Sequence, residues 1–360
     1  MDPSLPPETV PPPLDNDTFV RRLQVATYSV ILFVLVVYLL EKFREILQPL
    51  FVALFIGFLM HPIHRWLVRC RIPSLLSYCI ILVLVMLLFI GVGWLMFENF
   101  SAAADRDKLL KYEKKLDTMA RDLVKQVPFH VPEPDDGFLR QINISPDDLV
   151  AATAAMLGRL RDSTTWAFAV LLFLLFLVAE KVSFPRRIAL AFGDKRGEHI
   201  MSVAESINQA IGQYIAVKTL VSALAGVLSW VVLASFDVDL ATTWAILIFL
   251  LNYIPYLGSL IACALPIVLS FLQFDEVWKP IVIACLLIGI QQGIGTWIEP
   301  RIAGQRLDVS PMLIVLSLAF WASLWGIPGA ILAVPLLVIV KIILDNIPET
   351  KPIAMLISNR

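Results

Sequence analysis

The sequence predicts an all-α polytopic membrane protein. Hydrophobic residues make up 58% of the 360 residues, charged residues make up 16%, and the mean hydropathy is +0.79. Soluble domains usually carry about 45–50% apolar and about 25% charged residues. Several apolar stretches approach or exceed the roughly 20 residues with which a helix crosses a bilayer. Two longer apolar runs are interrupted near their middle by proline and glycine, which favours broken helices there.

Six stretches are expected to form full spans. In chain order they are Leu23–Leu40, Ile46–Met60, Leu75–Phe97, Thr164–Ala179, Ile207–Ser235 and Pro280–Ile298. Residues 1–20 are Pro-rich and acidic, so we expect a disordered tail. Residues 21–97 hold the first three spans, and residues 98–163 form a polar, helical extracytoplasmic region. Residues 164–345 form the transport core, and residues 346–360 form a cytoplasmic tail.

The orientation follows from the basic residues of the short connections. Lysine and arginine cluster after the second, fourth and sixth full spans. Such loops face the cytoplasm, because short basic loops are retained inside. The N- and C-termini are therefore expected to be cytoplasmic, and the region 98–163 lies outside.

The first broken run covers residues 240–274 and contains Asn252, Pro255 and Gly258 near its middle. Each arm has about 15 residues, or roughly 22 Å as helix, whereas the hydrocarbon core is about 30 Å thick. The acidic flanks "FDVD" and "FDEVWK" are both expected outside. The run is therefore interpreted as a helical hairpin that enters and leaves by one face.

The second broken run covers residues 309–344 and is interrupted by Gly326, Pro328 and Gly329. Its flanks are expected inside, so this hairpin would enter from the opposite face. Two such runs, of 35 and 36 residues, are typical of the inverted repeats of secondary transporters, whose substrate sites lie at helix breaks. Ordinary short spans with proline kinks, ten spans in all, are the alternative.

Polar residues inside predicted spans mark candidate sites, because they are costly in lipid. Lys218 lies about ten residues into the fifth span, and Gln213 is near it in sequence. Lys218 is interpreted as a residue that binds substrate or carries a coupling charge. The alternative is a lysine whose ammonium extends to the headgroups.

Gln291 and Gln292 interrupt the last full span before Glu299, which begins an "EPRIAG" loop. A carboxylate at the end of a helix is often simply solvated. The functional alternative is a gating or ion-coupling carboxylate paired with Arg301 or Arg306.

The sequence holds none of the motifs HExxH, GxSxG or GxxxxGK[ST], so we expect no enzyme, no cofactor and no metal site. The net charge of −1 gives no reason to expect nucleic-acid binding. The expected partners are a small-molecule solute and the lipid bilayer.

Three stretches resemble the autoinducer-2 exporter family of bacterial membrane proteins. They are "YIAVKTLVSALAGVL", "LNYIPYLGSLIACALP" and "WIEPRIAGQRLDVSPMLIVLSLAFWASLWGIPGAILAVPL". The resemblance implies about eight membrane segments, the bacterial inner membrane, and export of a small signalling molecule in quorum sensing. It also implies a homo-oligomer, with a pentamer as the best-supported form, and cation/proton antiport in some members.

Three functions follow as hypotheses. The first is a secondary transporter that exports a small polar solute, and the second is a Na⁺/proton antiporter in which Glu299 titrates. The third is a membrane scaffold that transports nothing, in which Gly258 and Pro328 would tolerate substitution.

Overall fold

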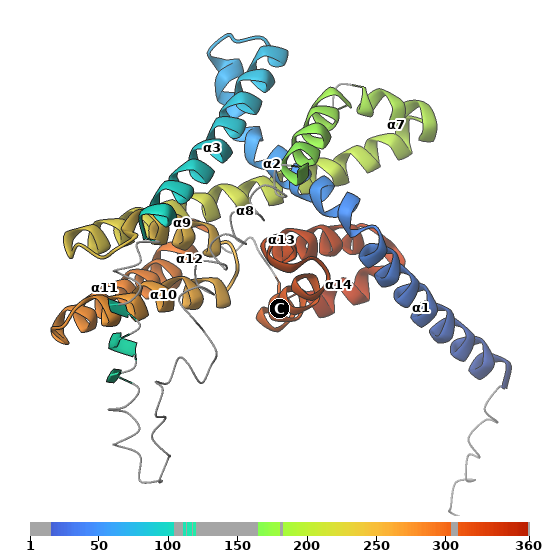
Figure 1. Ribbon diagram of the computed structural model, residues 1–360. Helices are drawn as coiled ribbons and strands as arrows, with labels where there is room; N and C mark the ends of the chain where they lie inside the picture. Colours follow the sequence, from blue (N-terminus) through green and yellow to red (C-terminus); the bar gives the residue numbers. More distant parts are fainter. Residues whose placement is uncertain are drawn as a thin grey trace, which may run out of the picture. The chain divides into compact units, whose positions relative to one another are not determined.

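The computed structural model describes residues 16–103, 111–112, 114–116, 118–119, 165–180, 183–303 and 309–358 (Figure 1). All regular secondary structure in these ranges is helical. The chain divides into two units, Met1–Leu47 and Gln48–Arg360, which are described separately. Most of the predicted tail, and most of the predicted polar region 98–163, lie outside the described residues.

The first unit contains α1, Asn16–Lys42, and the start of α2. The helix begins before the predicted span and includes it entirely. Its large apolar side chains are exposed, for example Tyr28 at 68% and Phe33 at 61%. An apolar helix without a polar face is suited to a lipid environment, and α1 is long and apolar enough to cross a membrane.

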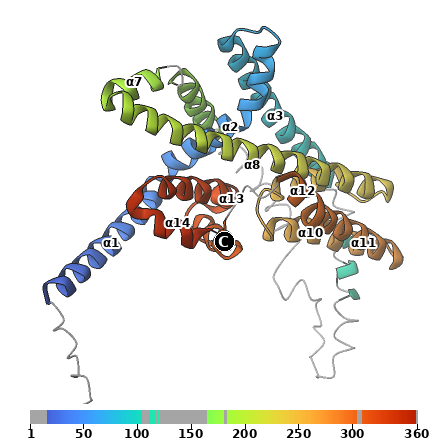
Figure 2. The same cartoon turned by 180° about the vertical axis from the view of Figure 1, so that it is seen from behind.

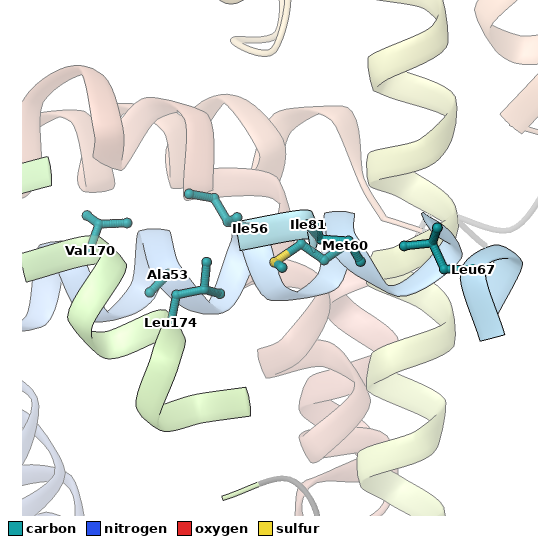
Figure 3. Close-up of a cluster of buried hydrophobic side chains, with 7 residues drawn as sticks. All are labelled: Ala53, Ile56, Met60, Leu67, Ile81, Val170 and Leu174. Atoms are coloured by element: carbon teal, nitrogen blue, oxygen red, sulfur yellow. The ribbon is translucent and has the colours of Figure 1, made fainter. Parts of the chain in front are cut away.

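The second unit begins within α2, Arg44–Arg69, which is followed by α3, Ser74–Ala103. α2 continues well beyond the predicted second span, so the basic stretch expected as a loop is largely helical. Figure 3 shows α2, α3 and the helix Thr165–Glu180 sharing one buried apolar cluster. This group, here called the scaffold cluster, consists of Ala53, Ile56, Met60, Leu67, Ile81, Val170 and Leu174.

α7, Phe184–Phe192, and α8, Asp194–Ser235, follow the fourth predicted span. The connection expected there is therefore helical, with a bend of 61° between Thr165–Glu180 and α7. α7 packs closely on α8, because a Cβ added at Gly197 would lie 3.2 Å from the Cα of Ala189. α8 has 42 residues, about 63 Å at 1.5 Å per residue, so it exceeds the hydrocarbon thickness of about 30 Å.

α8 is the central helix of the second unit, and Figures 1 and 2 show α9, α10 and α11 along its second half. α9 is Ala241–Leu251 and α10 is Leu257–Gln273. The close approach of α8 to α9 depends on Gly226, where a Cβ would lie 3.1 Å from the Ala245 carbonyl oxygen. Small residues allow such close packing between membrane helices.

The first broken run turns back on itself between α9 and α10. Pro255 lacks the N–H of a regular helix, and Tyr256 has φ 60°. Gly258 then passes against the end of α9, where a Cβ would overlap the Leu251 carbonyl oxygen. The arms have 11 and 17 residues, so the prediction of equal arms of about 15 was wrong; the helix already ends before Asn252.

The two ends of this first hairpin lie side by side. The Gln273 side chain accepts from the Asp239 N–H at 2.8 Å and donates to the Asp237 carbonyl at 2.7 Å. A described piece of the polar region reaches the same place, since Tyr112 donates to Asp239 at 2.5 Å and Lys115 contacts Asp275 at 2.8 Å. The chain therefore leaves the hairpin where it enters, as the acidic flanks predicted.

The second broken run, α13, Pro311–Asp345, also folds back on itself. Gly326 has φ 66° and ψ −141°, which interrupts the helix. Ser317 donates to the Ala333 carbonyl at 2.9 Å, although 16 residues of straight helix would separate them by about 24 Å. Gly329 permits the close approach, because a Cβ there would overlap the Trp321 carbonyl oxygen.

The last predicted full span continues further than expected. α11, Trp278–Gly293, leads into a π-helical turn, η1, Ile294–Ile298, and then into α12, Glu299–Ala303. Pro300 explains the π turn, because its ring would clash with the carbonyl four residues earlier in a regular helix. Glu299 is thus the first residue of α12, and its predicted placement in a loop was wrong.

Five helices in the described part of the chain are long and apolar enough to cross a membrane, and a sixth span results if Thr165–Glu180 and α7 are joined. One of the five is α13, which the Gly326 break folds in two. After α13 come a short 3₁₀ turn, η3, Pro348–Thr350, and α14, Lys351–Ile357. The fold is therefore that of an all-helical polytopic membrane protein, while the count of eight segments stays a prediction.

Candidate functional site

The centre of the candidate site is an ion pair between α8 and α12. The Lys218 Nζ lies 2.7 Å from the Glu299 Oε1, and Lys218 is 7% exposed. The ammonium is thus held inside the core and does not extend to the headgroups, as the alternative interpretation of Lys218 required. Glu299 was predicted to pair with Arg301 or Arg306. The prediction was wrong for Arg301, because the Glu299 carboxylate pairs with Lys218 and Arg301 is exposed. Arg306 lies outside the described residues.

An apolar cluster lies next to the ion pair in the sequence of α8. Val221 and Ala225 of α8, Ile248 of α9, Ala262 of α10 and Ile294 of η1 form this buried cluster. The Lys218 side chain is 8% exposed and the Glu299 side chain is 28% exposed, so the ammonium is shielded from water and the carboxylate only partly. Removing one partner of a fully buried pair typically costs about 3–5 kcal/mol, and the cost is smaller where one partner reaches water.

A tyrosine completes the surroundings of Glu299. Tyr214 lies one helical turn before Lys218 on α8, within electrostatic range of the Glu299 carboxylate and of Tyr253. It packs against Val309, Val334 and other residues of the second hairpin and α14. Tyr214 therefore connects the ion pair with the second hairpin.

The turn of the first hairpin, here called the first tip and formed by residues 252–256, is bonded to the next positions of α8. The Asn252 amide donates to Ser222 Oγ at 3.0 Å. The Thr219 hydroxyl lies 2.7 Å from both the Tyr253 hydroxyl and the Ile215 carbonyl. Since Thr219 donates to that carbonyl, Tyr253 donates to Thr219. Lys218, Thr219 and Ser222 thus form a continuous polar strip beside the first tip.

The break of the second hairpin, here called the second tip and formed by residues 325–330, lies near the first tip. Ile254 of the first tip packs in one buried cluster with Leu318, Ala330 and Ala333 of α13. The two predicted helix breaks are therefore neighbours in space. Among the predicted residues here, Gly329 is buried, Pro328 is partly buried and Gly326 is exposed.

Three predicted glutamines occupy different surroundings. Gln291 lies beside Cys263 of α10, and its buried Nε2 has no hydrogen-bond partner among the described residues. Gln292 is exposed and accepts from Thr296 at 3.4 Å. Gln213 is partly buried on α8. No bond joins Gln291 or Gln292 to the Lys218–Glu299 pair in the described part of the chain.

The sequence analysis missed Thr219, Ser222 and Tyr253 as candidates. Ser222 follows Lys218 by four residues, which places both on one face of α8, and this spacing could have identified it. Tyr253 adjoins a predicted residue, Asn252. No three His, Cys, Asp or Glu side chains of the described residues converge on a possible metal site.

Comparison with known proteins identifies the family. A family model described as "AI-2E family transporter" matches residues 28–349, which include every element of the candidate site. The chain belongs to the AI-2E transporter family.

Several curated relatives resemble this chain over most of its length. A "Putative transport protein" of Haemophilus influenzae is 30% identical over 322 residues, 88% of this chain and 90% of the relative. The AI-2 transport protein TqsA of Escherichia coli is 29% identical over 320 residues, again 88% and 90%. A relative from Borreliella burgdorferi, named like the first, is 28% identical over 331 residues, 92% and 89%. Membership of this family shows that the chain is a transporter.

Proposed function

We propose that this AI-2E family transporter is a secondary transporter that exports a small polar solute across the bacterial inner membrane. The observation that carries the proposal is the buried Lys218–Glu299 pair beside the first tip. A charged pair and a strip of hydroxyl groups are costly inside a membrane protein and usually mark a transport path. Their location next to a helix break supports a solute site there.

The solute is proposed to bind between the two tips. Each tip starts a new helix, α10 at Leu257 and the second arm of α13 after Gly326, and the first N–H groups of a helix attract oxygen atoms of a ligand. Asn252 and Lys218 carry further N–H groups that would donate to the solute, and the Tyr253 hydroxyl oxygen would accept. This set suits a polar solute rich in oxygen, and the name of TqsA makes AI-2 the first solute to test.

The proposed membrane arrangement has six full spans and two hairpins that enter from opposite faces, with both termini in the cytoplasm. The paired ends of the first hairpin support entry and exit by one face. A homo-oligomer, in which the hairpins move against a fixed scaffold, completes the proposal. Labelling of Asp239→Cys and Asn346→Cys in intact cells and inverted vesicles tests the orientation.

The transport proposal is tested by counterflow in proteoliposomes. Vesicles loaded with one unlabelled solute at a time are given the same solute in labelled form, over a panel of AI-2, sugars, polyols, hydroxy acids and amines. We expect transient accumulation of at least one oxygen-rich solute. If no solute of the panel exceeds protein-free vesicles while the protein is folded, the proposal is wrong.

A second candidate function is cation/proton antiport, because the core holds a carboxylate that pairs with a lysine. Protonation of Glu299 would break the ion pair, which could couple proton movement to the exchange of Na⁺. Vesicles with an imposed pH gradient distinguish the two functions. Dissipation of the gradient on addition of Na⁺, without any solute, favours antiport, whereas a gradient unaffected by Na⁺ excludes it.

A further inference from the structure

One face of α2 contacts the turns of both hairpins. Gln48, Phe51 and Phe55 follow each other at intervals of three and four residues, so they lie along one side of the helix. The roughly opposite side supplies Ala53 and Ile56 to the scaffold cluster (Figure 3). α2 therefore lies between the scaffold cluster and the two hairpins.

The contact with the second tip consists of a hydrogen bond and an aromatic pair. The Gln48 Nε2 donates to the Trp325 carbonyl at 3.3 Å, and Gln48 is 9% exposed. The rings of Phe51 and Trp325 have centroids 5.3 Å apart, and Trp325 is fully buried. In a regular helix the Trp325 carbonyl would bond to the N–H four residues later, but Gly326 interrupts that path. Gln48 thus supplies a donor where the helix is broken.

The contact with the first tip lies one turn further along α2. The ring of Phe55 meets Tyr253 edge-on, with centroids 6.2 Å apart and an interplanar angle of 74°. Tyr253 is the residue whose hydroxyl is bonded to Thr219 beside Lys218. Phe55 therefore holds a side chain that belongs to the polar strip.

We propose that the Gln48–Phe51–Phe55 face of α2 positions both tips and couples them, so that displacing one tip shifts α2 and loosens the other. α2 is suited to this because a helix is stiff and the scaffold cluster holds its other side. The inference rests on the proposed role of the tips in transport. The proposed role of α2, a helix outside the two hairpins, is to position both tips.

A direct contact between the tips offers another route of coupling, because Ile254 packs against Ala330. The test must therefore separate a signal carried by α2 from one carried by this contact. Both residues are buried, at 8% and 6% exposed. A cysteine at either position reports displacement of its tip by its rate of alkylation with a maleimide.

The experiment uses the full chain, reconstituted in lipid, with one reporter at a time. The four native cysteines are first replaced by alanine: Cys70, Cys79, Cys263 and Cys285. Phe55→Leu touches the first tip and is read at Ala330→Cys in the second. Gln48→Leu touches the second tip and is read at Ile254→Cys in the first. The matched control is Phe168→Leu, because Phe168 is an exposed residue of the helix Thr165–Glu180.

We expect each substitution to raise alkylation of the tip that it does not touch by about threefold, the size expected for losing one such contact. Phe168→Leu should change neither rate. The effect of Phe55→Leu on Ala330→Cys should persist when Ile254→Ala removes the direct contact. Thermal unfolding of each variant excludes general loosening.

Two results would overturn the proposal. In the first, each substitution changes only the tip that it touches. In the second, the effect of Phe55→Leu disappears with Ile254→Ala, which assigns the coupling to the direct contact. Counterflow on the same vesicles distinguishes failure of the coupling proposal from failure of the proposed transport function. If neither the parent nor any variant transports a solute, the transport function is contradicted, and the alkylation rates still test the coupling.

Discussion

The Lys218 ammonium and the Glu299 carboxylate lie 2.7 Å apart, although 81 residues separate them in the sequence. The pair joins the central helix α8 to the first residue of α12, directly after the π turn. Each side chain provides the opposite charge that stabilises the other inside the protein. The candidate site is organised around this pair.

The first prediction concerns the stability of the ion pair. Lys218→Met should lower the free energy of unfolding by about 1–3 kcal/mol, because it leaves the partly buried Glu299 without its partner. The double variant Lys218→Met/Glu299→Gln should recover most of this loss. The free energy of unfolding is measured by denaturation in mild detergent for four proteins: the parent, Lys218→Met, Glu299→Gln and the double variant. A loss in the double variant equal to the sum of the single losses would mean that the two residues are not coupled.

The second prediction concerns the glycines of the two tips. Gly258→Ala and Gly329→Ala place a methyl group against a backbone carbonyl, so each should lower the free energy of unfolding by about 1–3 kcal/mol and reduce transport. Gly289→Ala is the control, since a Cβ there has no atom within 4 Å. The scaffold hypothesis is favoured instead if both tip variants unfold and transport like the control.

The third prediction concerns Gly326, whose φ of 66° disfavours any residue with a side chain. A Cβ at this position meets nothing within 4 Å, so only the backbone conformation resists substitution. Gly326→Ala and Gly326→Asn should therefore each cost about 1–3 kcal/mol. Asparagine brings no relief, because it tolerates the left-handed helical region, at ψ of about +47°, whereas Gly326 has ψ −141°. Thermal unfolding of both variants is the measurement, and the absence of a loss in either variant would argue against a strained turn.

The fourth prediction concerns pH at the ends of the first hairpin. Hydrogen bonding to Lys115, together with the charges of Lys115 and Lys111, lowers the pKa of Asp275. A lowered pKa means that the contact stabilises the fold above the ordinary aspartate range, near 3.9, and that this contribution is lost as the pH falls through the lowered value. The effect is small, because Asp275 is exposed.

The measurement compares melting temperatures of the parent protein and of Asp275→Asn at pH 7 and pH 3. The variant should melt slightly lower at pH 7, and the difference should shrink as the pH falls. A difference that is unchanged at pH 3 would show that the carboxylate charge is not responsible.

Periodicity and composition could predict the hairpins but not their detail. The breaks could be predicted at Pro255, Gly258 and Gly326, because the backbone preferences of proline and glycine belong to the residue itself. The unequal arms of the first hairpin depend on tertiary packing, since α9 ends where Asn252 bonds to Ser222 of another helix. A local pattern holds no information about such a distant partner.

The ion pair was the main feature that sequence reasoning missed. Lys218 and Glu299 were both selected as candidates, but the partners proposed for Glu299 were Arg301 and Arg306, which are near it in sequence. The error came from treating Glu299 as the start of a loop. Pro300 and the π turn extend the helix instead and direct the carboxylate to α8. Sequence distance therefore misled the assignment.

The most direct test of the central claim is counterflow by the double variant Lys218→Met/Glu299→Gln, which removes both charges without leaving either unpaired. The account predicts that this variant folds with nearly the stability of the parent and yet fails to accumulate the solute that the parent transports. Transport at the parental rate by the folded double variant would contradict the claim that this ion pair lies at the centre of the transport site.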